Sequence, residues 1–218
     1  MPAHIQAAAL QGIEALPVDI EVDVLAGLPS FTVVGLIDRA IAESRERMIS
    51  ALTNCGYTPP RRKTIVSLAP ASLKKEGSHY DVPIALGFLI ASEQIRLSSS
   101  VASAKDGWFI GELGLDGAIR PVRGVLPIVL AAARAGAKAL YIPAGNAPEA
   151  QAAAEQLTIF AVKDLPELIA HLTGITVLKP VTTVDFPRLP PEPEIDFADI
   201  KGQEHAKRAL LVAASAGH

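Results

Sequence analysis

Strict alternation of apolar and acidic side chains in the stretch VDIEVDV constrains the fold most. Apolar residues at positions 18, 20, 22 and 24 alternate with carboxylates at positions 19, 21 and 23. Because successive side chains of a strand point to opposite faces, this strand has one buried face and one wet face. The apolar stretch HIQAAAL precedes it, and Gly12 lies between the two. The sequence therefore begins with two strands joined by a turn.

Helices and strands alternate after this pair. Periodicity predicts helices over residues 38–56, 81–95, 125–136, 147–155 and 164–174, and strands over 31–36, 64–70, 107–113, 138–143 and 157–162. Asp116-Gly117 marks a hairpin turn, and Trp108 is expected to pack in the core or at the domain edge. Strands followed by alternating helices and strands are typical of an α/β domain with a mixed sheet.

Composition narrows the class of protein further. Half of the 218 residues are hydrophobic and the net charge is -3, so no overall basic excess points to nucleic acid. The single cysteine, Cys55, fits a reducing compartment. The N-terminus lacks the pattern of a signal peptide, and the apolar runs are too short to span a bilayer. We therefore expect a cytoplasmic protein without a membrane partner.

The C-terminal fifth differs in composition from the rest. Residues 174–195 are rich in proline and lack periodicity, which is typical of an extended linker. A helical pattern resumes over residues 196–218. We expect a first domain over 1–173, a linker over 174–195, and the truncated start of a second domain over 196–218.

The loop KKEGSHYD raises the question of catalysis. Ser78 lies in a lysine-rich loop before a helix, where a nucleophile could stand. Ser78 and Asp81 are interpreted as helix caps instead, and His79 as a solvent-facing or capping residue. No His, Cys, Asp or Glu group has the spacing of metal ligands, so no metal site is expected.

Basic residues cluster before and after the strand TIVSLAP. Arg61, Arg62 and Lys63 precede it, and Lys74 and Lys75 follow it. Lysine and arginine contact phosphates without precise geometry, so these five residues are candidates for contact with nucleic acid. They leave opposite ends of one strand, which counts against a single patch. A solvated loop is the alternative for Lys74 and Lys75.

The tail DFADIKGQEHAKRALLVAASAGH resembles the beginning of an AAA+ ATPase module of the magnesium-chelatase type. The resemblance places Ile200, Gly202 and Gln203 near the adenine of ATP in the parent protein. The sequence contains no G-x-x-x-x-G-K-[ST] phosphate loop. We therefore expect this chain alone to need no cofactor, and the parent to use ATP and Mg.

Several longer stretches carry a second resemblance. GLPSFTVVGL, VSLAPASLKKEGSHYDVPIALGFL and FIGELGLDGAIRPVRGVLPIVLAAARAGAKALYIP resemble the N-terminal domain of the ComM/YifB family of Mg-chelatase-like AAA+ proteins. The resemblance implies an α+β two-layer sandwich, a mixed sheet with packed helices similar to the Lon protease domain.

Lon-type proteases use a serine and a lysine, each in its own motif. Aligned on the serine motif, Lys75, Glu76 and Gly77 match, Ser78 stands one residue out of register, and His79 takes the place of the nucleophile. Aligned on the lysine motif, Leu126 takes the place of the base, and a leucine cannot accept a proton. We therefore expect a degenerate dyad and no proteolysis by this chain.

The resemblance implies a role for the parent protein: a hexameric ATP-driven DNA helicase for branch migration during natural transformation. This chain would serve assembly, together with the rest of the AAA+ module, and DNA contact. One alternative is a serine protease that uses Ser78 with Lys74, Lys75 or His79 as the base. Another is the motor subunit of a metal chelatase, although those subunits begin with the ATPase.

Overall fold

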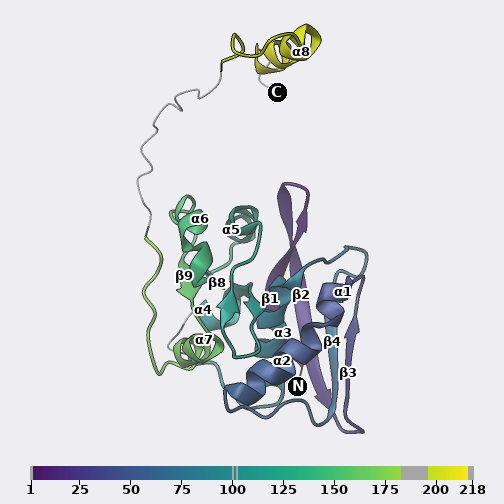
Figure 1. The fold of residues 1–218 in the computed structure, drawn as a ribbon. Coiled ribbons are helices and arrows are strands. Elements are labelled where there is room, and N and C mark those ends of the chain that lie inside the picture. Colours follow the sequence, from purple (N-terminus) through teal and green to yellow (C-terminus); the bar gives the residue numbers. More distant parts are fainter. Residues whose placement is uncertain (1, 100, 102, 183–195, 216–218) are drawn as a thin grey trace. The chain divides into compact units, whose positions relative to one another are not determined.

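The structure of the chain is a computed structural model that describes residues 2–99, 101, 103–182 and 196–215. It divides into two compact units, residues 1–184 and residues 185–218. The first unit holds the sheet (Figure 1).

A seven-stranded mixed sheet forms the centre of the first unit, in the order β3-β4-β2-β1-β5-β8-β9. The strands are β1 (Ala3–Gln11), β2 (Glu14–Leu25), β3 (Ser30–Val34), β4 (Lys63–Ala69), β5 (Gly107–Phe109), β8 (Ala139–Pro143) and β9 (Ile159–Val162). β2 pairs antiparallel with β1 and β4, and the other neighbours pair parallel. The predicted turn at Gly12 joins β1 to β2 with residue 11 opposite residue 14.

Helices and short elements connect these strands. They are α1 (Arg39–Ala42), α2 (Ser44–Asn54), the 3₁₀ turn η1 (Ser78–Tyr80), α3 (Asp81–Ala91), α4 (Ser103–Asp106), α5 (Val125–Arg134), the 3₁₀ turn η2 (Ala144–Asn146), α6 (Ala147–Gln151) and α7 (Leu165–Leu172). A small hairpin of β6 (Glu112–Leu113) and β7 (Ile119–Arg120) surrounds the predicted turn at Asp116-Gly117. In the second unit, α8 (Glu204–Ser215) has no buried residue.

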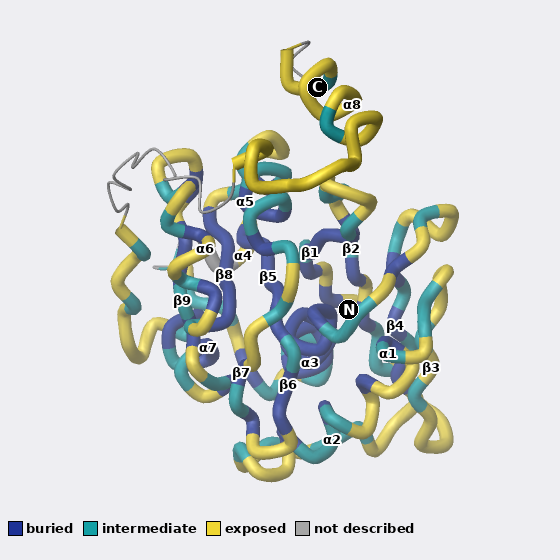
Figure 2. Tube along the Cα trace, turned by 45° about the horizontal axis from the view of Figure 1, so that its top comes forward, coloured by how far each residue is buried: buried dark blue, intermediate teal, exposed yellow. Residues whose placement is uncertain are grey.

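Helices cover both faces of the sheet. Neighbouring residues of β1 belong to two different cores. Ala7 lies in the core that includes residues of α2, α3 and α7, and Ala8 lies in the core that includes residues of α5 and α6. Figure 2 shows the central strands and α3 as the buried part of the first unit. The predicted mixed sheet with packed helices is confirmed. Helices cover both faces of the sheet, whereas a two-layer sandwich has helices on one face only. Trp108 is buried in the second core, as predicted.

Four elements differ from the sequence prediction by a break or by more than two residues. The helix expected over 147–155 ends at Gln151. The helix expected over 38–56 is split at Glu43. In the turn before the split, the Ala40 carbonyl accepts a hydrogen bond from the Arg47 guanidinium at 2.8 Å. The helix from Asp81 ends at Ala91, because Glu93 adopts a left-handed φ of 59°. The strand expected over 107–113 is broken at Gly111, whose amide donates to the His79 carbonyl at 2.9 Å.

The chain continues along the first unit after α7. The Val181 amide donates to the Ile159 carbonyl of β9 at 2.7 Å, and Leu178 packs on the first core. The compact unit therefore extends beyond Gly174, and residues 183–195 of the predicted linker lie outside the described residues. Among the described residues, no helix has the length and apolar character needed to cross a membrane.

Candidate functional site

A pocket of about 520 Å³ lies where the loop KKEGSHYD meets the segment before α5. Its lining residues are Leu10, Glu76, Gly77, Ser78, His79, Glu112, Pro121, Val122 and Arg123. We call this cavity the relic pocket. Its volume falls within the range of small-molecule sites, about 300 to 1,000 Å³.

Hydrogen bonds between side chains and backbone groups hold the walls of the relic pocket in place. Gly77 adopts a φ of 94°, which favours glycine, and its amide donates to the Asp38 carboxylate at 2.9 Å. On the other wall, the Asn146 side chain bonds both the amide and the carbonyl of Val122, at 2.9 and 2.8 Å. Both walls are therefore fixed by residues far away in the sequence.

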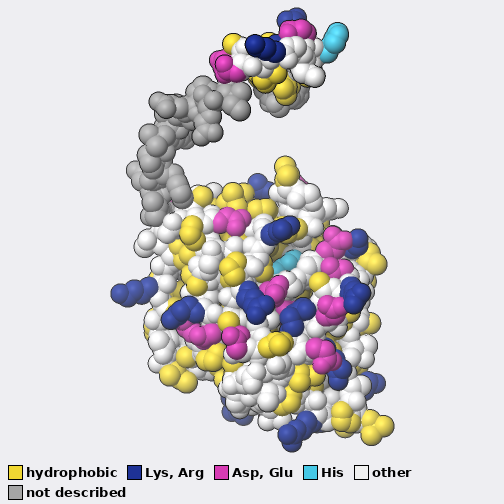
Figure 3. Space-filling model, viewed as in Figure 1, with side chains coloured by type: hydrophobic (Ala, Val, Ile, Leu, Met, Phe, Trp, Pro, Cys, Tyr) yellow, Lys and Arg dark blue, Asp and Glu magenta, His cyan; other side chains and the backbone are white. Residues whose placement is uncertain are grey.

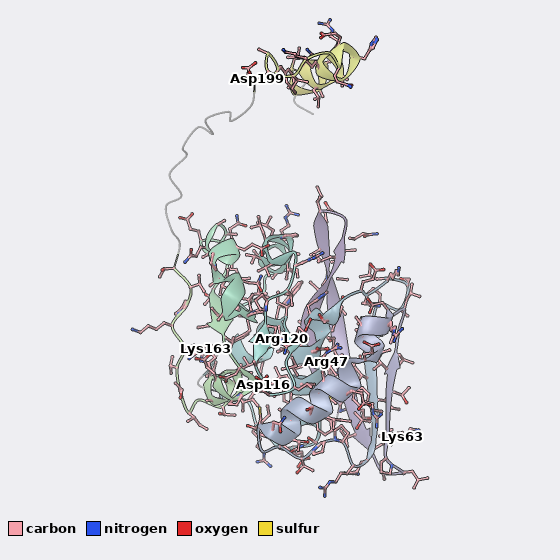
Figure 4. The ribbon with its side chains drawn as sticks, in the orientation of Figure 1. Arg47, Lys63, Asp116, Arg120, Lys163 and Asp199 are labelled. Atoms are coloured by element: carbon pink, nitrogen blue, oxygen red, sulfur yellow. The ribbon has the colours of Figure 1, made fainter. Side chains whose placement is uncertain are left out.

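Ser78 is bound to a carboxylate, and its predicted capping role is wrong. The Ser78 hydroxyl donates to the carboxylate of Glu112 on β6. Arg120, labelled in Figure 4, approaches the same carboxylate at 3.8 Å from the partner strand β7. Among the described residues, no hydrogen bond joins Ser78 to a lysine or a histidine. A serine held in this way has no paired nitrogen base of the kind a Ser-Lys or Ser-His enzyme needs.

His79 is buried, so its predicted solvent-facing or capping position is wrong. Its exposed fraction is 4%, and its ring lies against Tyr80 with a centroid distance of 4.0 Å. His79 Nε2 lies 2.8 Å from the Ala8 carbonyl on β1, which can only accept a hydrogen bond, so Nε2 carries the proton. Burial lowers the pKa of His79, and the bond to Ala8 opposes this effect. The imidazole is therefore held neutral.

Lys75 is also buried, which contradicts the prediction of a solvated lysine at this position. Its ammonium donates to the Pro70 carbonyl, and its amide donates to the Leu36 carbonyl at 2.9 Å. Burial lowers the pKa of Lys75. Lys74 does lie at the surface, where it pairs with Glu76. Both lysines offered as bases for Ser78 are thus engaged elsewhere.

Asp81 forms a buried ion pair instead of the predicted helix cap. It is the first residue of α3, and its carboxylate accepts from Arg47 Nε at 2.6 Å and Arg47 Nη2 at 2.9 Å. The Leu113 amide of β6 donates to it as well, at 3.2 Å. Burial raises the pKa of Asp81, and the Arg47 guanidinium opposes the rise. Through Arg47 on α2 (labelled in Figure 4), Asp81 on α3 and Leu113 on β6, this pair joins three elements of the first unit.

Leu126 stands outside the lining of the relic pocket. It lies in the first turn of α5, partly buried against the second core, and its amide donates to the Glu149 carboxylate at 3.0 Å. Its side chain thus contributes to packing at the position that the resemblance gives to a base.

The basic residues predicted to contact nucleic acid lie in two separate places. Arg61, Arg62 and Lys63 are exposed at the beginning of β4, and Lys74 and Lys75 follow its end. A seven-residue strand is about 23 Å long, so the two groups form no single patch. Figure 4 shows Lys63 well away from Arg120 and Arg47. Elsewhere on the face seen in Figure 3, cations and carboxylates are interspersed.

Among the described residues, the cations at positions 61–63 form no ion pair. The side chains of Arg61 and Arg62 line a shallow cavity of about 210 Å³ together with Val24 and Phe88. Leu28, 87% exposed, lies in the neighbouring loop between β2 and β3. We call residues 61–63 the basic segment. Cations free of carboxylate partners are available to a phosphate backbone.

The residues predicted to lie near adenine precede α8 in the second unit. Ile200 accepts a bond from Lys207 Nζ at 3.1 Å, and Gly202 and Gln203 adopt φ angles of 75° and 58°. They form the turn into the helix. The sequence supplies no phosphate loop beside them, so the residues present do not form a complete ATP or Mg site. Their role near adenine stays a prediction.

Sequence reasoning missed two sets of residues. Glu112 and Arg47 carry no motif, and only the fold brings them to the loop at Ser78 and Asp81. His4, Asp19 and Glu21 gather on the surface, with His4 Nδ1 3.2 and 3.8 Å from the two carboxylates. The turn at Gly12 could have revealed this group, because it places His4 opposite Glu21. Exposed charged neighbours of this kind are ordinary on a sheet and define no site by themselves.

The fold and the relic pocket define a mixed α/β domain whose pocket serine is hydrogen-bonded to a carboxylate and not to a nitrogen base. The family described as subunit ChlI of Mg-chelatase matches residues 20–146. The chain therefore belongs to this family, and nearly all of it is homologous to the N-terminal region of ComM and YifB.

Three relatives show the extent of the similarity. The competence protein ComM of Haemophilus influenzae is 38% identical over 219 residues, which cover 99% of this chain and 42% of ComM. YifB of Escherichia coli is 36% identical over 214 residues, 96% of this chain and 40% of YifB. Lon protease 2 of Bacillus subtilis is 27% identical over 129 residues, 59% of this chain and 22% of that protease. The chain thus spans about two fifths of the length of ComM and YifB.

Proposed function

We propose that this chain is the non-proteolytic, Lon-like accessory domain of a ComM-type AAA+ DNA motor, and that its basic segment contacts DNA. In this proposal the parent protein is a cytoplasmic hexamer that uses ATP and Mg. It drives branch migration of DNA during natural transformation and recombination. The accessory domain contributes to assembly of the hexamer and to DNA contact.

The similarity to a competence protein across 99% of the chain carries the proposal. The relic pocket supports the non-proteolytic part. The Ser78 hydroxyl donates a hydrogen bond to the Glu112 carboxylate, and Leu126 stands where the resemblance gives a base. The two lysines nearest in sequence are engaged with Glu76 and Pro70. A serine without a paired lysine or histidine lacks the nitrogen base of Ser-Lys and Ser-His enzymes.

The basic segment supports the DNA-contacting part. Its three cations are exposed and form no ion pair among the described residues, although carboxylates outnumber cations in the whole chain by 23 to 20. Unpaired cations on an acidic protein can bind phosphates without first breaking an ion pair. Of the lysines after β4, Lys75 is buried and so does not support this role, whereas Lys74 is exposed and paired with Glu76, and its contact with DNA stays a prediction.

Fluorescence anisotropy with labelled single-stranded and forked DNA across a salt series tests the proposal. We expect affinity to fall as salt rises, because phosphate contacts release counterions. Replacing all three cations of the basic segment by glutamine should flatten the slope of log K against log salt by about 2 for single-stranded DNA. A matched control replaces three exposed cations elsewhere on the first unit: Lys105, Arg134 and Lys138.

If the control variant flattens the slope as much as the basic-segment variant, binding is nonspecific and the basic segment has no special role. If the unmodified chain fails to bind at low salt, the DNA-contacting part of the proposal is wrong. Labelling of Ser78 by a fluorophosphonate probe on the folded chain would overturn the non-proteolytic part.

A further inference from the structure

The shallow cavity beside the basic segment opens into the edge of the first core. Phe88 of α3 is a buried member of that core, and Val24 of β2 is partly buried against it. The floor of the cavity is therefore apolar, and the exposed side chains of Arg61 and Arg62 line it as well. We call this space the edge cavity. Its lining residues are Val24, Thr58, Pro59, Arg61, Arg62, Phe88, Ser92 and Gln94.

The charge of the edge cavity favours an anionic ligand. Arg61 and Arg62 form no ion pair among the described residues, and none of the residues that line the cavity carries a carboxylate. Lys63 (labelled in Figure 4) follows them, and a side chain at Gly27 would lie 3.7 Å from its Cβ. The loop that contains Gly27 also presents Leu28, which is 87% exposed. Free cations and exposed apolar groups thus occur together around this cavity.

Hydrogen bonds within the rim of the edge cavity hold it in place. The Thr58 amide donates to Gln94 Oε1 at 2.8 Å, and Gln94 Nε2 donates to the Thr58 carbonyl at 3.0 Å. Gln94 Nε2 also donates to Ser92 Oγ at 2.9 Å. Because these polar groups bind one another, the rim offers little that could read the hydrogen-bond pattern of a ligand. Recognition by the edge cavity therefore depends on shape, apolar contact and charge.

A nucleobase of a single DNA strand matches these features. The edge cavity measures about 210 Å³, below the range of drug-sized sites that starts at about 300 Å³, so it has room for one flat ring system. Guanidinium groups stack on flat rings and also contact phosphates, so Arg61 and Arg62 suit both parts of a nucleotide. A duplex keeps its bases inside the helix, where the cavity cannot reach them.

An acidic peptide with an apolar side chain is the alternative occupant. It would meet the same cations and the same apolar floor. The N–H and C=O groups of its backbone also need hydrogen-bond partners when they are covered, and the polar groups of the rim are already engaged with one another. The edge cavity therefore fits a nucleobase better than a peptide.

We propose that the edge cavity accepts one unpaired nucleobase of a DNA strand whose phosphates contact the basic segment. The inference rests on the proposed function, because it takes the basic segment to contact DNA. The base lies against Val24 and Phe88, and the guanidinium of Arg61 or Arg62 stacks on it. Stacking and apolar contact tolerate any base, so we expect little dependence on DNA sequence. A single strand is then the form of DNA that engages both the cations and the cavity.

Fluorescence anisotropy at low salt tests this proposal with two labelled ligands of equal length. One is an oligothymidylate, and the other is an abasic strand with the same number of phosphates. We expect the oligothymidylate to bind about tenfold more tightly, because base stacking on a protein side chain contributes a factor of this size. The salt dependence of the two affinities should be equal, because both strands present the same phosphates. A short unlabelled peptide with leucine between two glutamates should not displace the oligothymidylate.

Val24→Phe fills the edge cavity and should abolish the preference for the oligothymidylate over the abasic strand. The cations stay in place, so the salt dependence should not change. Val34→Phe is the matched control, because Val34 of the edge strand β3 is 47% exposed and lies outside the lining of the edge cavity. This control variant should keep the preference of the unmodified chain.

Equal affinity of the unmodified chain for the two strands would overturn the inference and leave the DNA-contacting part of the proposed function in place. Failure of both strands to bind would overturn both. Displacement of the oligothymidylate by the peptide at a comparable concentration would show that the edge cavity takes a protein ligand, and would overturn the inference. These comparisons need only the unmodified chain, so they decide the question even if Val24→Phe does not fold.

Discussion

Replacing Arg47 by methionine should destabilise the first unit strongly. Arg47 donates two of the three hydrogen bonds that the buried Asp81 carboxylate accepts, at 2.6 and 2.9 Å, and the Leu113 amide donates the third. Asp81 is fully buried and the Arg47 side chain is 20% exposed. Methionine keeps the apolar stem of Arg47 and removes the charge, so the variant leaves a carboxylate buried without its counterion.

Removing one partner of a buried ion pair costs about 3 to 5 kcal/mol. The partial exposure of Arg47 lets water reach the site, so we expect about 3 kcal/mol, the lower end of that range. A domain has a free energy of unfolding of about 5 to 15 kcal/mol, so the loss is a large part of the total. Because Asp81 also holds the Leu113 amide, the loss should loosen β6 and the hydrogen bond between Ser78 and Glu112.

Urea unfolding followed by circular dichroism measures the effect. Arg45→Met is the matched control, because Arg45 pairs with Glu46 at the surface and such pairs contribute less than about 1 kcal/mol. The reasoning is refuted if the two variants lose the same free energy of unfolding. A double variant that also replaces Asp81 by leucine should lose less than Arg47→Met alone, because no charge is then left buried.

The pH dependence of Arg47→Met gives an independent check. Burial raises the pKa of Asp81 in the folded state, and without Arg47 only the hydrogen bond from the Leu113 amide opposes this rise. The folded variant then takes up a proton at a higher pH than the unfolded chain does. The free energy of unfolding that Arg47→Met loses should be largest above the raised pKa of Asp81. This loss should become smaller as pH falls through that pKa. A deficit that grows on acidification would contradict this assignment.

Two further predictions concern the relic pocket. Burial lowers the pKa of His79, so the folded state favours the neutral ring; stability should fall as pH drops below about 6.5, the ordinary value, and level off below the lowered pKa. Urea midpoints between pH 5 and 8 should show this fall in the unmodified chain and lose part of it in His79→Gln. Leu126→Lys should not create a protease, because Leu126 lies outside the pocket lining and Ser78 is already bound to Glu112. Fluorophosphonate labelling checks this, and a labelled Ser78 in that variant would show that only the base was missing.

The sheet and most helices could be predicted from the sequence because their signals are local. Alternation at residues 18–24 and a glycine at position 12 are enough to predict β2 and its hairpin with β1. Helix ends were harder, because they depend on contacts distant in sequence: Arg47 reaches the Ala40 carbonyl where the helix expected over 38–56 divides. The covering of both sheet faces likewise depends on how the helices pack.

The candidate site was only half predictable. The register of the serine motif singled out the loop at Ser78, which lines the pocket, and the register of the lysine motif singled out Leu126, which lies outside the lining. It could not show that His79 and Lys75 turn inward, because their burial depends on Ala8 and Pro70, which accept their hydrogen bonds. A polar loop is predicted to be exposed to solvent when the groups that accept its hydrogen bonds lie in distant parts of the sequence. Glu112 was missed for the same reason.

An NMR footprint of single-stranded DNA on the labelled chain tests the central claim most directly. The account predicts that backbone shifts cluster at the basic segment, residues 61–63, and at the adjoining residues 27–28 and 58–59. Residues 76–79 and 121–123 of the relic pocket should not shift. Shifts concentrated at the relic pocket, or no shifts at low salt, would contradict the claim that this domain meets DNA through its basic segment.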